Sequence, residues 1–313
     1  MTVLDDRARS WVAAELGSQV ESVSVLTGGV ASQMLAVRSV TGGQAVLRRM
    51  TVEPWRSFAQ GLLRREFEVQ AMLQEEPVPT PTPIAVDLDG AESGEPSLLM
   101  SRLPGRVDFV RDDDGHLSSL AELLVRLHRF RPPEDSWPRD FQSWAFESKM
   151  TVPPWSSDDG LYVEAFARLR EPPPAYRRTF LHRDFYPANV LWEDGTITGL
   201  VDWVETSSGP ADLDVAHCSS NLAGLHGVDC ALAFAEAYVS TGGVLDPDED
   251  ASRYWQLMDL VAFLPEGSGR ESGATGATMT DVWRANDRPD LTPGLARRRR
   301  EDLLRAILTG RTR

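Results

Sequence analysis

Residues 180–203 constrain this chain more than any other stretch. They read Phe-Leu-His-Arg-Asp-Phe-Tyr-Pro-Ala-Asn-Val-Leu-Trp-Glu-Asp-Gly-Thr-Ile-Thr-Gly-Leu-Val-Asp-Trp. Short apolar runs on both sides of a polar loop predict buried strands, and Glu-Asp-Gly at 193–195 predicts a turn between two strands. The expected hairpin-like unit therefore carries one carboxylate before it, one carboxamide at its start and a second carboxylate at its end.

These three polar side chains suit phosphoryl transfer. Mg²⁺ prefers a few oxygen ligands together with substrate phosphates, so Asn189 and Asp202 are candidate metal ligands. Asp184 is a carboxylate on the same loop that can accept the proton of an attacking hydroxyl group. Positioning and charge neutralisation supply most of the catalysis in such a centre. A single acidic loop capped by Asn is the alternative interpretation, but it leaves the second carboxylate, thirteen residues after Asn189, unexplained.

The pattern His-x-Asp-x-x-x-x-Asn, followed by Asp-Trp, resembles the aminoglycoside phosphotransferase family. Members of that family are small-molecule kinases that share the protein-kinase fold. The resemblance is sharp over residues 181–216 and fair over 20–105. It implies that Asp184 is the catalytic base and that Asn189 and Asp202 hold the metal ion.

The same resemblance assigns supporting roles around the loop. It implies that His182 supports the loop and that Asp214, in the run Gly-Pro-Ala-Asp-Leu-Asp, braces it from below. Arg183 stands where members of this family usually have Gly. Protein kinases also have an arginine at this position, so the change leaves the other assignments in place.

Alternating apolar residues predict three antiparallel strands between residues 20 and 50. Gly28 and Gly29 turn the chain between the first two strands. A plain hairpin explains two glycines equally well, but the family resemblance implies that this loop lies over the phosphates of a nucleotide. On that basis Gly28, Gly29 and Ser32 are candidate phosphate-side residues.

Protein kinases bind the nucleotide phosphates with a lysine on the third strand, and this sequence has no lysine there. The resemblance places Arg48 at that position, and a guanidinium group can bind phosphate in a bidentate manner. We expect Arg48 rather than Arg49 to face the site, because neighbouring residues of a strand point to opposite faces. The helix expected at 62–74 offers Glu66 as the ion-pair partner of Arg48, with Glu68 as a competitor that helical phase alone does not exclude.

Prolines end that helix, and two further strands are expected before residue 102. The run Arg-Leu-Pro-Gly that follows resembles the family's hinge, which implies that backbone groups near Met100 and Leu103 meet the base of ATP or GTP. Helical periodicity dominates from there onward. We therefore expect an α+β, two-lobed protein-kinase-like fold, with an antiparallel β-rich nucleotide-binding lobe over 1–102. A mainly helical lobe over 103–313 would hold the catalytic loop and the acceptor site.

Composition argues against several classes of protein. The net charge of −15, from 32 basic and 47 acidic residues, argues against nucleic acid as a partner, since a phosphate backbone binds a basic surface. No apolar run is long enough to predict a membrane span, and the first residues lack a signal-peptide pattern. Two cysteines are too few for a disulfide framework, so we expect a cytoplasmic protein.

A zinc site is a further interpretation of the histidines and cysteines at His217, Cys218, His226 and Cys230. Their spacing matches no common zinc site, and helix packing is the preferred interpretation.

The sequence leaves the identity of the phosphoryl acceptor open. An aminoglycoside is the default that the resemblance implies, and acidic clusters at 112–114, 158–159 and 246–250 could bind its ammonium groups. Aromatic residues around 137–155 and 255–263 could equally line an apolar pocket for a macrolide or another metabolite. The alternative from a different class is a catalytically silent, nucleotide-binding regulatory protein. The complete set of polar loop residues argues against it, whereas the missing third-strand lysine keeps it open.

Overall fold

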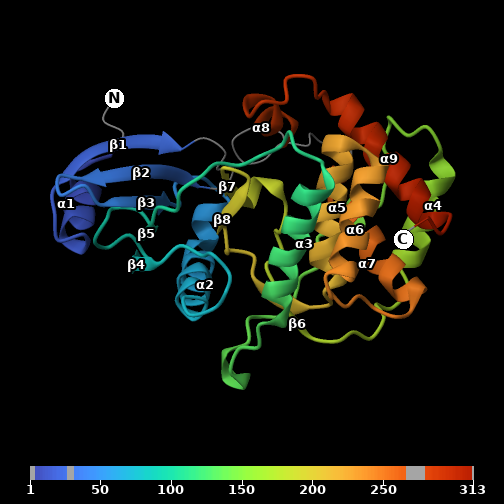
Figure 1. Ribbon diagram of the computed structural model, residues 1–313, viewed down its shortest axis with the longest axis horizontal. Helices are drawn as coiled ribbons and strands as arrows, with labels where there is room; N and C mark the ends of the chain where they lie inside the picture. Colours follow the sequence, from blue (N-terminus) through green and yellow to red (C-terminus); the bar gives the residue numbers. More distant parts are fainter. Residues whose placement is uncertain (1–3, 27–31, 266–278, 312–313) are drawn as a thin grey trace. The chain divides into compact units, whose positions relative to one another are not determined.

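The computed structural model describes residues 4–26, 32–265 and 279–311, which form two compact units. The first, which we call the β unit, comprises the described parts of Met1–Gly105, Thr198–Glu205 and Ser272–Val282. The second, the helical unit, comprises those of Arg106–Ile197, Thr206–Glu271 and Trp283–Arg313. The fold is the α+β, kinase-like fold expected from the sequence, with an antiparallel sheet in one unit and mainly helices in the other (Figure 1).

The β unit is built on a five-stranded antiparallel sheet with the strand order β1-β2-β3-β5-β4. Its strands are β1 (Val20–Leu26), β2 (Gln33–Ser39), β3 (Gln44–Arg49), β4 (Pro83–Asp87) and β5 (Ser97–Ser101). Its helices are α1 (Asp6–Glu15), the short 3₁₀ helix η1 (Trp55–Phe58) and α2 (Ala59–Met72).

Alternation along β3 decides which side chains reach each face of this sheet. Ala45 and Leu47 pack with α1, whereas Val46 packs with α2. Because successive strand residues point to opposite faces, Arg48 shares the α2 side with Val46. Arg49 lies on the other side, where its Nη2 is 2.8 Å from Oδ2 of Asp5. The two arginines therefore separate as the sequence predicts.

The helical unit holds the helices α3 (Asp114–Arg129), α4 (Asp159–Leu169), α5 (Asp212–His226), α6 (Val228–Ser240), α7 (Glu249–Ala262) and α9 (Pro293–Leu308). Nearly every side chain of α5 is buried, because α6, α7 and α9 pack around it. The short helices η2 (Glu134–Ser136), η3 (Glu147–Lys149) and η4 (Pro187–Asn189) lie in the connections, and α8 (Met279–Ala285) precedes α9. No helix within the described ranges is both long and apolar enough to cross a bilayer.

Short strands position the polar loop. β6 (Thr179–Leu181) pairs antiparallel with β9 (Ser207–Gly209), and β7 (Val190–Glu193) forms a two-stranded sheet with β8 (Thr196–Leu200). Both strands of the first pair are fully buried, which fixes the point at which the loop begins.

Helix capping accounts for the three acidic clusters of the sequence. Asp113, Asp158 and Asp248 are the N-cap residues of α3, α4 and α7, and each side chain accepts a hydrogen bond from a backbone N–H of the first turn. Acidic residues also favour the positive end of the helix dipole. These clusters therefore have a structural role that requires no cationic acceptor.

Candidate active site

Asp184 lies on the loop after β6, between two side chains that hold its carboxylate. Asn189 Nδ2 donates to Asp184 Oδ2 at 2.9 Å and to the Asp184 main-chain oxygen at 2.8 Å. The Asp184 side chain keeps 27% of its surface exposed, so a substrate hydroxyl can reach it. Because the amide nitrogen of Asn189 is directed at Asp184, its carboxamide oxygen is the atom left to bind a cation.

His217 of α5 contacts the other carboxylate oxygen of Asp184. Its Nε2 lies 3.0 Å from Asp184 Oδ1, and its Nδ1 lies 3.0 Å from Oδ1 of Asp259, a fully buried residue of α7. Phe263 stacks on the imidazole with ring centroids 5.5 Å apart. Burial alone lowers the pKa of His217, but the carboxylates of Asp259 and Asp184 outweigh it and raise this pKa to about 9. The imidazole is therefore a buried cation between two carboxylates at neutral pH.

Asp214 supports the backbone of the loop from α5. Its carboxylate accepts the N–H groups of His182 at 2.8 Å and of Arg183 at 2.7 Å, and it lies 3.1 Å from Nε2 of His128. Burial raises the pKa of Asp214, but the hydrogen bonds and the charges of the two histidines outweigh it, and the pKa is lowered overall. His182 is fully buried, and its Nδ1 accepts the N–H of Asp184 at 3.3 Å. These contacts hold the backbone of the loop at residues 182–184, and the supporting roles that the resemblance implies for Asp214 and His182 stay predictions.

Arg183 adopts a backbone conformation that favours glycine. Its φ is +70°, in the left-handed region that costs an ordinary residue about 1–2 kcal/mol. The side chain is nevertheless buried and held, since its guanidinium carbon lies 3.8 Å from the ring centroid of Trp144. Its Nη1 is 3.9 Å from Asp259 Oδ1. This φ value explains why family members usually have glycine at this position. In this chain the contacts of the Arg183 side chain offset the backbone strain.

A second group of polar side chains lies within the β unit. Arg48 Nε is 3.1 Å from Glu66 Oε2, and Arg48 Nη1 is 3.1 Å from Asp202 Oδ1. Burial and the nearby Asp202 raise the pKa of Glu66 to about 7, while Arg48 acts against both. Glu68 is exposed, so Glu66 is the helix glutamate that meets Arg48. Asp202 has a φ of +67°, a strained value of the kind that persists at functional sites.

The remaining predicted nucleotide contacts are spread over the β unit. Gly28 and Gly29 lie outside the described residues. Ser32 is buried, and its hydroxyl lies 3.4 Å from the sulfur of Met34. Met100 is buried in β5, and Leu103 is half-buried beyond the end of that strand. Their roles stay predictions.

Asn189 in the helical unit and Asp202 in the β unit each carry an oxygen donor of the kind that Mg²⁺ prefers, and their shared role as metal ligands stays a prediction. A carboxamide and a carboxylate oxygen are hard donors, and Mg²⁺ completes its coordination with water and phosphate oxygens rather than with a protein cage. No group of three or more His, Cys, Asp or Glu side chains in the described part of the chain is arranged to hold a metal ion. The zinc interpretation of His217, Cys218, His226 and Cys230 has no such arrangement to support it.

Sequence reasoning missed the parts played by His217 and Asp259. Helix packing was the expected role of His217, whereas the structure puts it against the candidate base. The signal was present, because Asp214 and His217 are three residues apart and share one face of a helix. Asp259 stands in the apolar run Leu-Met-Asp-Leu-Val-Ala-Phe, where an isolated carboxylate requires a buried partner.

Comparison with known proteins gives one consistent result. A model of the phosphotransferase enzyme family matches residues 22–255. The aminoglycoside phosphotransferase APH(4)-Ia, solved with AMP-PNP and hygromycin B, has a TM-score of 0.63 at 18% identity, covering 96% of this chain and 99% of its own. Macrolide 2′-phosphotransferase MphH from Brachybacterium faecium has a TM-score of 0.58 at 18% identity, covering 80% and 88%. The type VIII aminoglycoside-3′-phosphotransferase also reaches 0.58, at 20% identity, covering 84% and 100%.

Proposed function

Because the chain belongs to the phosphotransferase enzyme family, we propose that it transfers the γ-phosphoryl group of ATP or GTP to a hydroxyl group of a small molecule, with Mg²⁺ as cofactor. The observation that carries the proposal is the carboxylate of Asp184, which Asn189 and His217 hold from two sides while it stays accessible. A positioned, accessible carboxylate is what the acceptance of a hydroxyl proton requires.

Asp184 orients the acceptor hydroxyl and takes its proton as the new P–O bond forms, while the bond between the γ-phosphorus and the bridging oxygen breaks and the nucleoside diphosphate leaves. The contact with His217, which is itself paired with Asp259, fixes the direction of the Asp184 carboxylate. A fixed direction matters more than strong basicity here, because a loose phosphoryl-transfer transition state gains most from positioning. Asp214 keeps the backbone of the loop in place through its two N–H contacts.

Asn189 and Asp202 are the proposed metal ligands, and a bound Mg²⁺ would supply charge neutralisation at the phosphates. Arg48 is the proposed phosphate contact from the protein side, with Glu66 fixing its guanidinium group. A guanidinium can serve two oxygen partners at once, which supports a role next to both Asp202 and a phosphate.

For the acceptor we propose a hydroxylated ring compound of the aminoglycoside or macrolide type. The solved relatives act on such compounds by their names, and one holds hygromycin B. The half-buried rings of Trp144 and Phe263 beside His217 support an acceptor that presents an apolar face near the reacting hydroxyl. Helix capping gives the acidic clusters a structural role, which weakens the argument that they bind the ammonium groups of a polycationic acceptor. These two observations favour the macrolide type over the aminoglycoside default.

The test is release of nucleoside diphosphate with Mg²⁺ and ATP or GTP, against separate pools of macrolides, aminoglycosides and hydroxylated metabolites. Asp184→Asn should lower acceptor-dependent release by about 10²–10⁴-fold, since it removes the base at constant size. Asp194→Asn is the matched control, because Asp194 is an exposed residue in the turn between β7 and β8. It should leave the rate unchanged. An Asp184→Asn rate equal to wild type would overturn the proposed role of Asp184.

A catalytically silent nucleotide-binding protein is the second candidate, favoured by the arginine in place of the third-strand lysine and its ion pair with Asp202. It predicts thermal stabilisation by MgATP or MgGTP without diphosphate release in any pool. Wild type and Asp184→Asn would then behave alike. Absence of stabilisation by either nucleotide would count against both candidates.

A further inference from the structure

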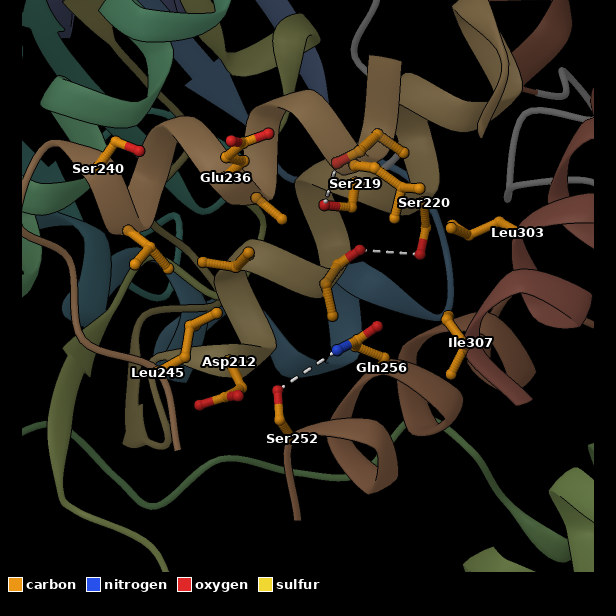
Figure 2. A pocket seen from close by; sticks show the side chains of 16 residues that line it. Asp212, Ser219, Ser220, Glu236, Ser240, Leu245, Ser252, Gln256, Leu303 and Ile307 are labelled. Carbon is orange, nitrogen blue, oxygen red and sulfur yellow. Dashed lines mark hydrogen bonds between the residues drawn. The ribbon is translucent and has the colours of Figure 1, made fainter. Parts of the chain in front are cut away.

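The helical unit contains a cavity of about 170 Å³ that the phosphoryl-transfer chemistry does not use. Helices α5, α6, α7 and α9 enclose it, together with Leu245 from the segment between α6 and α7 (Figure 2). Leu303 and Ile307 of α9 lie at one side of the view, and Leu245 and Ser240 lie at the other. Its wall is mostly apolar, with a few hydroxyl, amide and carboxyl groups.

Asp212 lines this cavity with a carboxyl group that is not fully satisfied. The residue is 3% exposed, and its Oδ2 accepts the N–H of Asp246 at 3.1 Å. Its Oδ1 is buried and has no hydrogen-bond partner within the described residues. Burial raises the pKa of Asp212, although the nearby Ser252 hydroxyl and the Asp246 N–H partly offset this. A buried carboxyl oxygen without a donor costs free energy that a bound donor would recover.

The charge of the lining points to the kind of donor. Among the described residues that line the cavity, Asp212 and Glu236 carry formal charge, and both are acidic. Glu236 and Ser240 of α6 are exposed, so they lie at the solvent side of the cavity, whereas Asp212 lies inside. A cation would meet one carboxylate on entry and a second within, while an anion would meet no opposite charge.

This cavity and the catalytic loop lie against opposite faces of α5. Asp214 and His217 contact the loop, whereas Asp212, Val215 and Ser219 line the cavity. Asp212 and Asp214 are two residues apart, which separates them by about 200° around the helix axis. An acceptor held at Asp184 therefore does not occupy the cavity.

We propose that the cavity binds a small organic cation, a primary ammonium group attached to a compact apolar group. The ammonium donates to Oδ1 of Asp212, and the apolar group packs against Leu303, Ile307 and Val215. The size is suitable, because an apolar protein cavity of ~150 Å³ is enough to bind benzene. This binding does not depend on phosphoryl transfer.

The sequence offers a direct readout of binding. It contains three isoleucines, Ile84, Ile197 and Ile307, and Ile307 is the one that lines the cavity. A sample labelled at the isoleucine δ1 methyl groups therefore gives one resonance at the site and two internal references. Titration with benzylamine should shift the Ile307 signal and leave the other two in place. Benzyl alcohol should bind more weakly, and benzoate should not bind.

Three variants separate this proposal from unspecific binding. Asp212→Asn should weaken benzylamine binding about 10- to 100-fold, the usual range for losing a hydrogen bond to a charged group. Ala235→Leu, which adds bulk at the cavity wall, should also reduce binding, and it keeps the test valid if Asp212→Asn does not fold. Asp229→Asn is the control for charge, because Asp229 is an exposed residue at the start of α6. It should bind as wild type.

Two results would overturn the proposal. One is that benzylamine and benzyl alcohol bind with equal affinity and that the Asp212→Asn variant binds benzylamine as tightly as wild type. The other is an Ile307 signal that does not move at millimolar benzylamine.

Discussion

His217 Nε2 lies 3.0 Å from Asp184 Oδ1, so the candidate base is paired with a buried imidazole that is itself paired with Asp259. This chain of three side chains joins the catalytic loop to α5 and α7. It gives Asp184 a fixed direction and a compensating charge in surroundings that exclude much of the water.

The first prediction concerns catalysis by the His217→Gln variant. Glutamine can keep a hydrogen bond to Asp184 but cannot carry the charge, so we expect kcat to fall by about 10- to 100-fold, with a smaller change in KM. In wild type, kcat should decline as pH rises through about 9, where His217 loses its proton, and this limb should disappear in the variant. Rates measured between about pH 6 and 10 check both points.

His226→Gln is the matched control, because His226 lies on the same helix and burial lowers its pKa to about 4. It should leave the alkaline limb unchanged. An identical alkaline limb in wild type and His217→Gln would contradict the role assigned to His217.

The second prediction concerns stability and follows from the same pKa. A histidine whose pKa is higher in the folded than in the unfolded chain stabilises the fold below its unfolded pKa of 6.5. That stabilisation is lost as pH rises through about 9. The contribution is on the order of 3 kcal/mol. Urea unfolding at pH 6 and 10 should show a smaller pH-dependent loss in His217→Gln than in wild type. An equal loss in both proteins would be inconsistent with a charged His217.

The third prediction tests the strain at Arg183. Arg183→Gly relieves the positive φ but loses the contacts with Trp144 and Asp259, whereas Arg183→Ala loses the contacts and keeps the strain. We expect both variants to be less stable than wild type, with alanine below glycine by about 1 kcal/mol. Chemical denaturation measures the difference. If Arg183→Ala were as stable as Arg183→Gly, or more stable, the backbone would have relaxed at this position.

The fourth prediction concerns the buried ion pair of Arg48 and Glu66. Arg48→Met leaves Glu66 buried without its cation and should lower the free energy of unfolding by about 3–5 kcal/mol. Adding Glu66→Gln should recover much of this loss, because the uncompensated charge is removed. Arg49→Met is the control: its partner Asp5 is half exposed, so a smaller loss is expected. A double variant no more stable than Arg48→Met would argue that packing, not charge, governs the site.

Much of the fold and of the candidate site follows from local sequence. Alternation over 44–49 places Arg48 and Arg49 on opposite sides of the sheet, and the spacing from His182 to Asp202 identifies the loop residues. The opposite facing of the two arginines can be predicted because strand preferences act over a few neighbouring residues, whereas the roles of the loop residues stay predictions. Conversely, the acidic clusters suggested ligand binding, and their capping role becomes clear once the helix starts are known.

By itself, the sequence determined the family, the β-rich and helical segments and the identity of the polar loop residues. The tertiary structure alone decided that His217 and Asp259 support Asp184, that Arg48 reaches Asp202 as well as Glu66, and that a cavity forms beside Asp212. The physical reason is distance along the chain. Asp184 and Asp259 are brought together by helices that pack through their apolar faces, and no local preference encodes which polar side chains then meet.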